Sequence, residues 1–345
     1  MKAAIFEKFG SALTIKSVPD PITHADAAVI RVHACGVCRS DWHAWMGHDD
    51  EVRLPHVPGH ELSGTVISVG EWVKQWKSGD RVTVPFCCGC GTCPECAAGN
   101  PHICDRYTQP GFTQWGAFAQ QVEIRFADVN LVHLPNSIDY VTAASLGCRF
   151  ATSFRAIVHQ GKTKAGDWVA VHGCGGVGLS AIMIARAIGA MVIAIDIQPS
   201  RLAAAKTLGA AETIDASKQS VISRIREITG RGANVSIDAL GSHTTCWNSI
   251  ECLAKRGRHV QVGLMLGDQA NPSIPMGAVI AKELEIYGSH GMQAFEYSRL
   301  LAMIETGTLQ PSKLISDTVT LAEGANLLTR MNDFPNAAIT VIEID

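Results

Sequence analysis

The sequence predicts an α/β protein in which a mainly antiparallel β domain with cysteine-rich loops is combined with a doubly wound parallel sheet. Up to about residue 150, short apolar segments alternate with polar residues between Gly and Pro turns, as in antiparallel strands. From Asp167 to about Ser289, nearly continuous apolar strands alternate with helical stretches. That alternation is typical of a parallel sheet with helices on both faces.

The expected elements follow from these two patterns. In the first part we expect strands at Met1–Phe6, Ala27–Val32, Leu62–Val69, Arg81–Pro85 and Ala117–Ile124. In the second part we expect strands at Trp168–His172, Met191–Asp196, Glu212–Asp215, Asn234–Ala239 and Arg258–Gly263. Helices are expected between them at Gly178–Ile188, Ser200–Leu208, Val221–Thr229 and Thr245–Ala254. After Ser289 we expect one helix, about Phe295–Glu305, and a last strand, Ala338–Ile344.

Size, charge and termini narrow the class of protein. A chain of 345 residues, 47% hydrophobic and 18% charged, has room for two globular domains. The net charge of −3 gives no electrostatic reason to expect nucleic acid or a membrane as partner. Met1–Lys8 lacks the apolar core of a signal peptide, and no apolar run approaches the roughly 18 residues of a membrane span. We therefore expect a soluble cytoplasmic protein.

The stretch from Cys35 to Glu61 concentrates groups that bind metals. Cys38 and His60 offer a thiolate and an imidazole, which are zinc ligands, and a ligating histidine usually donates its other N–H to a carboxylate. We interpret Cys38 and His60 as ligands of a catalytic zinc, with Asp41 behind His60 and Ser40 beside the open coordination position. Taken alone, the stretch also fits a core cysteine with surface polar residues.

A second cysteine cluster has closer spacing. Cys90, Cys93, Cys96 and Cys104 form a C-x2-C-x2-C-x7-C pattern, and six of the twelve cysteines fall between Cys87 and Cys104. Four thiolates from one loop can surround a tetrahedral ion and leave no open position, which predicts a structural zinc. An iron–sulfur cluster is the rival interpretation. Cys87 and Cys88 lie outside the pattern and receive no role.

A glycine motif follows the first strand of the second part. Gly173, Gly175 and Gly178 stand in a G-x-G-x-x-G arrangement between the strand Trp168–His172 and an apolar helix, and the next strand ends in Asp196. This is the dinucleotide-binding arrangement, in which glycines make a tight turn, admit the pyrophosphate and pack the helix on the strand. Asp196 would accept hydrogen bonds from ribose hydroxyls and repel a 2′-phosphate, so NAD is favoured over NADP.

Cys148 lies where the β part gives way to the α/β part. On its own it is better explained as a small buried hydrophobe than as a ligand. A catalytic zinc nevertheless needs a third protein ligand, and a cleft between domains is a common place for a cofactor and a metal.

Together these motifs resemble the zinc-dependent medium-chain alcohol dehydrogenases, essentially from end to end. The matching residues are Cys38-Arg39-Ser40-Asp41-x-His43, Gly59-His60-Glu61, the four-cysteine lobe, Gly147-Cys148, Gly173–Gly178 and Asp196. The resemblance implies a GroES-like catalytic domain at residues 1–150 and 289–345 and a Rossmann domain at residues 151–288. It also implies two zinc ions and NAD, an alcohol or carbonyl substrate, and a homodimer or homotetramer. The short connections look more like the tetrameric microbial forms.

The resemblance also implies residue roles. Cys38, His60 and Cys148 would hold the catalytic zinc, and Glu61 would be an occasional fourth ligand or a carboxylate behind the metal. Ser40 would take the alcohol proton and pass it through the nicotinamide ribose to His43, whose reference pKa near 6.5 suits exchange with solvent. Phe86 looks like a wall of the substrate pocket. Cofactor contacts would come from Arg39, Thr152, Gly173, Gly175, Gly176, Val177, Gly178, Asp196, Arg201 and Val262.

Some residues depart from the family pattern. Asn336-Ala337-Ala338 stands where many relatives carry an arginine that touches the pyrophosphate. Trp42, Trp45 and the acidic run Asp49-Asp50-Glu51 are not general family features, and the tryptophans fit core packing as well as a pocket.

The reaction that these groups favour is hydride transfer between an alcohol carbon and a nicotinamide ring, because zinc lowers the pKa of a bound alcohol oxygen. One alternative is a polyol or amino-alcohol dehydrogenase of the same fold, although Cys148 argues against it because those relatives often use a carboxylate there. Another is a zinc-stabilised redox sensor or binding protein on a dehydrogenase scaffold.

Overall fold

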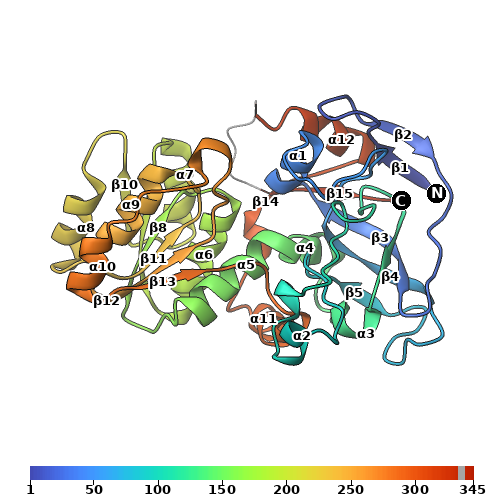
Figure 1. Cartoon of the computed structure of the whole chain (residues 1–345), viewed down its shortest axis with the longest axis horizontal. Helices are drawn as coiled ribbons and strands as arrows, with labels where there is room; N and C mark the ends of the chain where they lie inside the picture. The colour runs from blue at the N-terminus through green and yellow to red at the C-terminus, as the bar shows by residue number, and fades with distance from the viewer. Residues whose placement is uncertain (333–338) are drawn as a thin grey trace. The chain divides into compact units, whose positions relative to one another are not determined.

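The computed structural model describes residues 1–332 and 339–345 (Figure 1). The chain divides into two compact units. The described residues of unit 1 are Met1–Ala151, 291–332 and Ile339–Asp345, and unit 2 comprises Thr152–His290. Among the described residues, unit 2 is one continuous segment inserted into unit 1.

Unit 1 is built on a seven-stranded sheet in the order β14-β15-β3-β4-β5-β7, with β6 paired to β3. Its neighbours are antiparallel except for the parallel pair β14–β15. The strands are β3 (Ala28–Gly36), β4 (Glu61–Val69), β5 (Arg81–Thr83), β6 (Gln121–Ile124), β7 (Val132–His133), β14 (Ile315–Val319) and β15 (Ile339–Glu343). A separate antiparallel pair joins β1 (Lys2–Ile5) to β2 (Thr14–Ser17).

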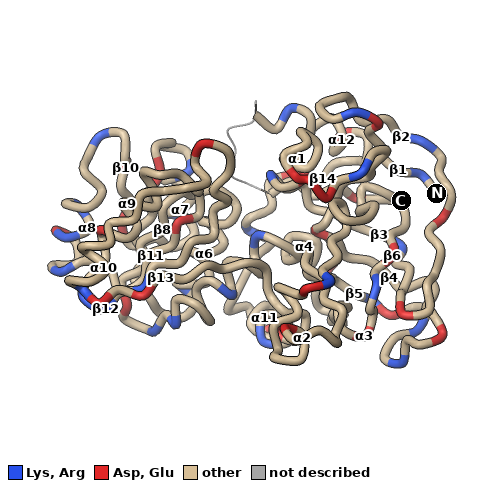
Figure 2. Tube along the Cα trace, viewed as in Figure 1, with Lys and Arg blue, Asp and Glu red and all other residues tan. Residues whose placement is uncertain are grey.

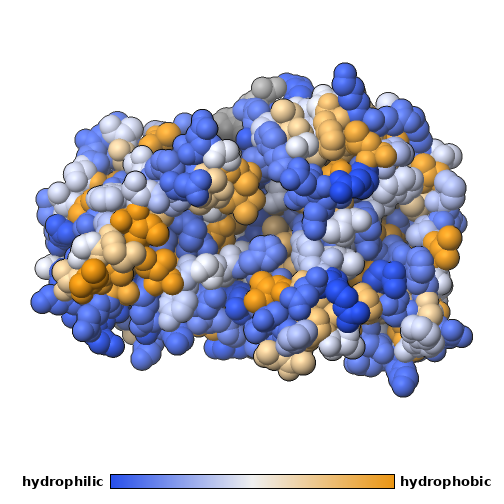
Figure 3. All heavy atoms as spheres, in the orientation of Figure 1, coloured by the Kyte–Doolittle hydropathy of each residue, from blue (hydrophilic) through white to orange (hydrophobic). Residues whose placement is uncertain are grey.

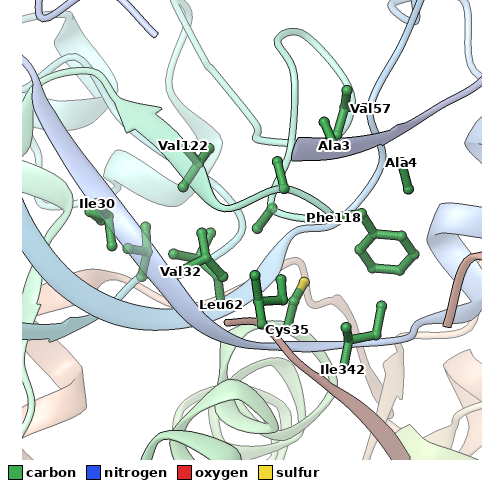
Figure 4. Packing of buried hydrophobic residues seen from close by; sticks show 14 of the residues in the cluster. Ala3, Ala4, Ile30, Val32, Cys35, Val57, Leu62, Phe118, Val122 and Ile342 are labelled. Atoms are coloured by element: carbon green, nitrogen blue, oxygen red, sulfur yellow. The ribbon is translucent and has the colours of Figure 1, made fainter. Parts of the chain in front are cut away.

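The core of unit 1 forms where the buried faces of these strands meet. Ile30 and Val32 of β3 pack with Leu62 of β4 and Val122 of β6 (Figure 4). In β6 the apolar residues alternate with half-buried polar ones, as a strand with one covered face requires. This core holds the ends of β3 and β4 in place. The potential metal ligand Cys38 follows β3, and the potential ligand Glu61 begins β4.

Short helical segments connect the strands of unit 1. They are α1 (Arg39–Trp45), α2 (Pro94–Ala97), α3 (Ala127–Asn130), α4 (Tyr140–Ala144), α11 (Tyr297–Glu305) and α12 (Leu321–Thr329), with 3₁₀ turns at Pro101–Ile103, Ala294–Glu296 and Pro311–Leu314. A π-helical turn, Leu146–Phe150, follows α4 and runs into α5 (Ala151–Phe154), the helix in which the boundary between the units falls.

Unit 2 is a six-stranded parallel sheet in the order β10-β9-β8-β11-β12-β13. The strands are β8 (Trp168–His172), β9 (Met191–Asp196), β10 (Glu212–Asp215), β11 (Ala233–Asp238), β12 (Leu253–Gln261) and β13 (Glu285–Gly288). The helices are α6 (Gly176–Ile188), α7 (Pro199–Thr207), α8 (Val221–Thr229), α9 (His243–Glu251) and α10 (Met276–Lys282), preceded by a π-helical turn at Arg155–Gln160 and with a 3₁₀ turn at Gly267–Gln269. The strand order reverses between β8 and β11, which makes the sheet doubly wound and confirms the predicted fold class.

The sequence prediction was incomplete near the end of each unit. It omitted α10 and β13, and it placed one helix and one strand after Ser289, whereas the structure adds β14 and α12 there. The strand β12 also begins five residues before the expected Arg258, because exposed Lys255 and Arg256 hide it from a hydrophobicity pattern. These segments are short or lie at an edge, so their apolar periodicity is weak.

Charge is spread over both units. Figure 2 shows Lys and Arg mixed with Asp and Glu along the chain of each unit, with no face of a single sign in this view. Among the described helices, none combines the length and apolar character needed to cross a membrane.

Candidate active site

Four potential metal ligands of unit 1 come together in a buried group. One donor atom each from Cys38, His60, Glu61 and Cys148 lies within 4.8 Å of all the others. Cys38 and His60 are buried, and so is Glu61. Ligands of one tetrahedral zinc lie about 3.3–3.8 Å apart, so a small adjustment brings such a group around one ion.

The first ligand is placed by the start of α1. Cys38 is the N-cap residue of this helix, and the Asp41 carboxylate accepts the Cys38 backbone N–H at 3.1 Å in a capping box. The other oxygen of Asp41 accepts the Gly59 N–H at 3.0 Å and the His60 Nδ1–H at 2.8 Å. One buried carboxylate thus caps the helix and orients the histidine, as the sequence predicted for Asp41.

The residue before His60 has a backbone conformation and close packing that require glycine. Gly59 has a φ of +106°, and a Cβ there would lie 2.5 Å from the Phe118 ring. His60 follows immediately, and β4 then begins at Glu61. The turn at Gly59 therefore places the His60 imidazole and the Glu61 carboxylate at the start of β4.

Cys148 is supplied by the π-helical turn. Such turns displace one residue outward and are frequent at functional sites. The turn is anchored by the buried Tyr297 hydroxyl, which donates to the Leu146 carbonyl at 3.3 Å, and by the Phe86 N–H, which donates to the Gly147 carbonyl at 3.0 Å. The residue that sequence alone left ambiguous therefore lies beside Cys38 and His60.

The donor chemistry fits a zinc ion. With Nδ1 bonded to Asp41, His60 has only Nε2 for a ligand, and this buried atom has no hydrogen-bond partner among the described residues. A hydrogen bond with Cys148 lowers the pKa of the Cys38 thiol well below its usual range, and the positive charge of Arg149 adds to this. Two thiols and a correctly oriented imidazole are the donors that zinc prefers.

Glu61 has a partner that sequence reasoning missed. The Arg149 Nε–H donates to Oε1 of Glu61 at 3.0 Å, the Arg149 Nη2–H donates to Oε2, and the Arg149 backbone N–H also reaches Oε1 at 3.2 Å. Burial raises the pKa of Glu61, and the Arg149 charge opposes that shift. A charged residue directly after Cys148 in an otherwise apolar segment was the available signal.

Ser40 and His43 lie on α1 beyond Cys38. The Ser40 hydroxyl is 3.8 Å from the Cys38 sulfur. The His43 ring faces a residue outside the prediction, exposed His48, with 3.0 Å between the two Nδ1 atoms. Burial lowers the pKa of His43 to about 4, helped by Arg39 and His48, so the expected reference value near 6.5 does not apply and the ring is neutral at pH 7.

The four-cysteine lobe forms a second metal-binding group. The sulfurs of Cys90 and Cys96 are 4.0 Å apart and those of Cys93 and Cys104 are 3.6 Å apart, near the roughly 3.8 Å of tetrahedral zinc thiolates. Burial disfavours ionisation of Cys90, but backbone N–H groups of Thr92 and Cys93 and the Thr92 hydroxyl lower its pKa to about 5. The lobe therefore offers a cation four sulfur donors from one loop, and the pKa of one of them, Cys90, is already lowered.

The glycine motif of unit 2 has the geometry that close packing requires. Gly173 has a φ of +91°, and a Cβ on Gly178 would lie 1.8 Å from the Gly173 carbonyl oxygen. A Cβ on Gly175 would meet no atom within 4 Å, so the backbone is open on that side. The turn leads into the N-terminus of α6, whose free N–H groups attract a phosphate.

Asp196 ends β9 next to this turn. Its carboxylate accepts N–H groups from Cys174 at 2.8 Å and Gln198 at 2.9 Å, and Arg201 lies 3.9 Å away. The acid therefore also stabilises the glycine loop, a role not predicted from the sequence.

Comparisons with known proteins identify the family of this chain. The family model described as "Alcohol dehydrogenase GroES-like domain" matches residues 24–136, and "Zinc-binding dehydrogenase" matches residues 176–306. An NAD-dependent alcohol dehydrogenase of Sulfurisphaera tokodaii is 31% identical over 97% of each chain, and a sorbitol dehydrogenase of Bacillus subtilis is 30% identical over 99% of this chain and 96% of its own. The alcohol dehydrogenase structure from Thermus sp. ATN1 has a TM-score of 0.92 and 31% identity, with full coverage of both chains.

The chain belongs to the zinc-dependent medium-chain alcohol dehydrogenase family. The predicted resemblance is confirmed. The protein is a zinc-dependent, NAD-linked oxidoreductase that interconverts an alcohol and its aldehyde or ketone by hydride transfer. Its classification as an enzyme removes the redox-sensor alternative.

Within this dehydrogenase, aromatic residues surround the His60 ring. Phe86 meets it edge-on at 6.1 Å between ring centroids, and Phe112, which sequence reasoning missed, does so at 5.4 Å. Trp42 and Trp45 are both buried in the core of unit 1, and the Trp45 indole N–H donates to the Ser11 carbonyl at 2.6 Å. Core packing therefore accounts for Trp45, while Trp42 also stacks under the Arg39 guanidinium at 4.0 Å.

The remaining predicted positions are placed as follows. Thr152 is buried near the start of unit 2, and the Val262 N–H donates to the Asp238 carbonyl just after β12. Cys88 packs in the core of unit 1, and Cys87 is buried with its sulfur 4.0 Å from the Met292 carbonyl. The departure at Asn336-Ala337-Ala338 lies outside the described residues.

Proposed function

We propose that unit 1 is the catalytic domain and holds the catalytic zinc on Cys38, His60 and Cys148, and that unit 2 binds the dinucleotide. The observation that carries this proposal is the buried donor group of unit 1, in which Asp41 orients His60 and leaves its Nε2 free to bind a metal. A three-ligand site with one open position is the usual arrangement of a catalytic zinc.

A zinc ion in this site supplies Lewis-acid polarisation of the alcohol or carbonyl oxygen. The protein has to receive a proton from the alcohol and release it to water. The Ser40 hydroxyl lies 3.8 Å from the Cys38 sulfur and can hold this proton on its oxygen. His43 and His48 then offer adjacent imidazole nitrogens, and His48 reaches solvent. A neutral His43 can accept a proton on one nitrogen and donate from the other, so it relays without storing charge.

The second zinc is structural in our proposal and is bound by Cys90, Cys93, Cys96 and Cys104. Its thiolates accept N–H groups from their own loop, and Arg106 donates from its side chain to Cys90 and from its backbone to Cys104. Such a closed shell offers no place for a substrate.

For the cofactor, we propose that the turn Gly173–Gly178 binds the pyrophosphate and that Asp196 binds the adenosine ribose. Gly176 and Val177 open α6 and belong to the same phosphate cradle, while Arg201 lies beside Asp196. Arg39, Thr152 and Val262 complete the set of proposed contacts. A carboxylate at the ribose excludes a 2′-phosphate by charge repulsion, which favours NAD.

The test is an assay of NADH and NADPH formation with a panel of primary, secondary and aromatic alcohols, combined with a zinc count per chain. We expect turnover with NAD and two zinc ions. Sorbitol and threonine belong in the panel, because a sorbitol dehydrogenase is among the relatives, and faster turnover of either would favour the polyol or amino-alcohol alternative. No NAD-linked turnover of any alcohol would refute the proposal.

We also propose that the protein is a cytoplasmic homo-oligomer, with a tetramer favoured over a dimer. Its thiol ligands require a reducing compartment to stay available for zinc. The edge strand β13 and helix α10 expose apolar side chains, visible as an orange patch in Figure 3. The exposed large apolar residues of these two elements are Met276, Ile280 and Ile286.

Light scattering tests the oligomer. Ile280 is 73% exposed, so Ile280→Glu has little effect on the folded chain but places a charge in the patch. We expect the variant to lose mass toward a smaller assembly, whereas Ile22→Glu, at a 76% exposed position of unit 1, keeps the wild-type mass. A monomeric wild-type protein would contradict the proposal.

A further inference from the structure

The ion pair between Glu61 and Arg149 directly adjoins two of the proposed zinc ligands. Glu61 follows His60 in sequence, and Arg149 follows Cys148. Three N–H groups of Arg149, from Nε, Nη2 and the backbone, point at the two oxygens of Glu61. The Glu61 side chain has no exposed surface, and the Arg149 side chain is 11% exposed. The pair is therefore a buried, bidentate clamp beside the metal-binding group.

The space for this clamp is set by a glycine on the neighbouring strand. Gly36 of β3 pairs with Glu61 of β4, and a Cβ on Gly36 would lie 2.3 Å from Oε2 of Glu61. The carboxylate thus lies against bare backbone on one side. On its other side it has the arginine and, within 4.8 Å, the donors of Cys38, His60 and Cys148.

Two cations can neutralise this carboxylate. The Arg149 guanidinium does so in the structure, and a zinc ion held by the three other donors would be close enough to do so after a small movement of Glu61. A buried carboxylate without a cation is strongly unfavourable, so loss of the arginine would drive Glu61 toward the metal. A fourth protein ligand would then fill the position that a substrate oxygen needs.

We propose that Arg149 is a positioning residue that holds Glu61 away from the catalytic metal and so keeps one coordination position open. This inference rests on the proposed function of Cys38, His60 and Cys148. The planar guanidinium matches both carboxylate oxygens at once, which an ammonium group cannot do.

The test replaces zinc with cobalt(II) and follows the visible d–d absorption while imidazole is titrated as a probe of the open position. The closed four-cysteine lobe contributes a constant background, because it has no position for imidazole. In the wild type we expect saturable binding. In Arg149→Met we expect at least about tenfold weaker imidazole binding and an altered cobalt spectrum before imidazole is added, because Glu61 occupies the position.

Two further variants separate coordination from general disruption. Arg149→Met combined with Glu61→Gln removes the competing ligand, so imidazole affinity should return to within about twofold of wild type. Arg125→Met breaks a similar arginine fork, in which Nε lies 2.6 Å and Nη2 3.0 Å from the Asp26 carboxylate, outside the metal group, and should leave imidazole binding unchanged. If Arg149→Met does not fold, Arg149→Lys keeps the charge without the fork and should weaken imidazole binding at least threefold.

The outcomes distinguish the two levels of the proposal. Wild-type affinity in Arg149→Met, or in Arg149→Lys where only that variant folds, would overturn the role of Arg149. Failure of the Glu61→Gln double variant to restore binding would overturn it as well. If imidazole does not change the cobalt spectrum of the wild type, the proposed three-ligand site fails instead.

Discussion

The two cysteine clusters of unit 1 are built in different ways. The four-cysteine lobe comes from residues 90–104, and backbone N–H groups of that same loop donate to its sulfurs. The second group joins the N-cap of α1, the residues at the start of β4 and a π-helical turn, and its orientation depends on Asp41, Tyr297 and Arg149. The four-cysteine cluster is stabilised by its own loop, whereas the cluster assembled from distant segments depends on the surrounding fold. In the part of the chain that the structure describes, the assembled cluster leaves the buried His60 Nε2 without a hydrogen-bond partner, so this atom is available to a metal.

Serine substitution in each cluster gives the largest expected contrast. Cys38→Ser should lower kcat/KM by roughly 10³-fold or more, because the catalytic metal is lost, while the melting temperature changes by no more than about 3 °C. Cys93→Ser should lower the melting temperature by about 5 °C or more, because the lobe loses the ion that closes it. Activity assays and thermal melts of both variants measure this. If both melt alike and stay active, the division of the cysteines is wrong.

The dependence of the assembled group on its neighbours can be measured through Asp41. Asp41→Asn keeps an oxygen that caps α1 but removes the charge behind His60. We expect zinc affinity and kcat/KM to fall by about 10–100-fold. Asp128→Asn is a matched control, because Asp128 also accepts two backbone N–H groups, from Lys74 and Gln75, but is remote in sequence from every ligand. Equal effects of the two substitutions would show that Asp41 acts only as a cap.

The same contrast explains what could be predicted from the sequence. The four-cysteine spacing, the glycine motif and Asp196 are encoded within short segments, so their pattern was readable without a structure. The partner of Glu61 could not be predicted from the sequence, because Arg149 is 88 residues away and contacts Glu61 only in the folded chain. The lowered pKa of His43 was also missed, because burial and the positions of Arg39 and His48 determine it. Short edge elements such as β13 and β14 have too few residues to show a period.

A buried histidine in unit 2 leads to a prediction of how the free energy of unfolding depends on pH. His172 of β8 is buried with Nε2 3.7 Å from the Cys252 sulfur, and burial lowers its pKa to about 3. Above pH 6.5, His172 is neutral in both the folded and unfolded chains and does not change the free energy of unfolding with pH. Below pH 6.5 the unfolded chain binds the proton first, so the free energy of unfolding falls until the pH reaches about 3. At pH 5 this loss is about 2 kcal/mol.

Urea unfolding at pH 7 and pH 5 measures this loss. His172→Gln should reduce the difference between the two pH values by about 2 kcal/mol. His243→Gln, at an exposed position on α9 of the same unit, should leave it unchanged. If His172→Gln leaves the difference in unfolding free energy between pH 7 and pH 5 unchanged, this histidine does not resist protonation in the folded chain.

The smallest expected effect concerns a locally encoded residue, Asp196. Asp196→Gly should lower the ratio of kcat/KM with NAD to kcat/KM with NADP by about tenfold, equal to about 1.4 kcal/mol, because the charge that repels a 2′-phosphate is gone. Asp215→Asn is the control, since Asp215 ends the adjacent strand β10 in register with Asp196. An unchanged ratio would contradict the proposed role of Asp196 in cofactor choice. If the substitution lowers only the stability, Asp196 serves only to bind the Cys174 and Gln198 N–H groups.

The central claim is that a zinc ion is bound jointly by Cys38, His60 and Cys148 in the active enzyme. Anomalous diffraction at the zinc absorption edge, on crystals grown from protein of known specific activity, tests this directly. The account predicts two zinc peaks per chain, one within the four-cysteine lobe and one in contact with the Cys38 sulfur, His60 Nε2 and the Cys148 sulfur. Fully active protein with no zinc peak at those three atoms would contradict it.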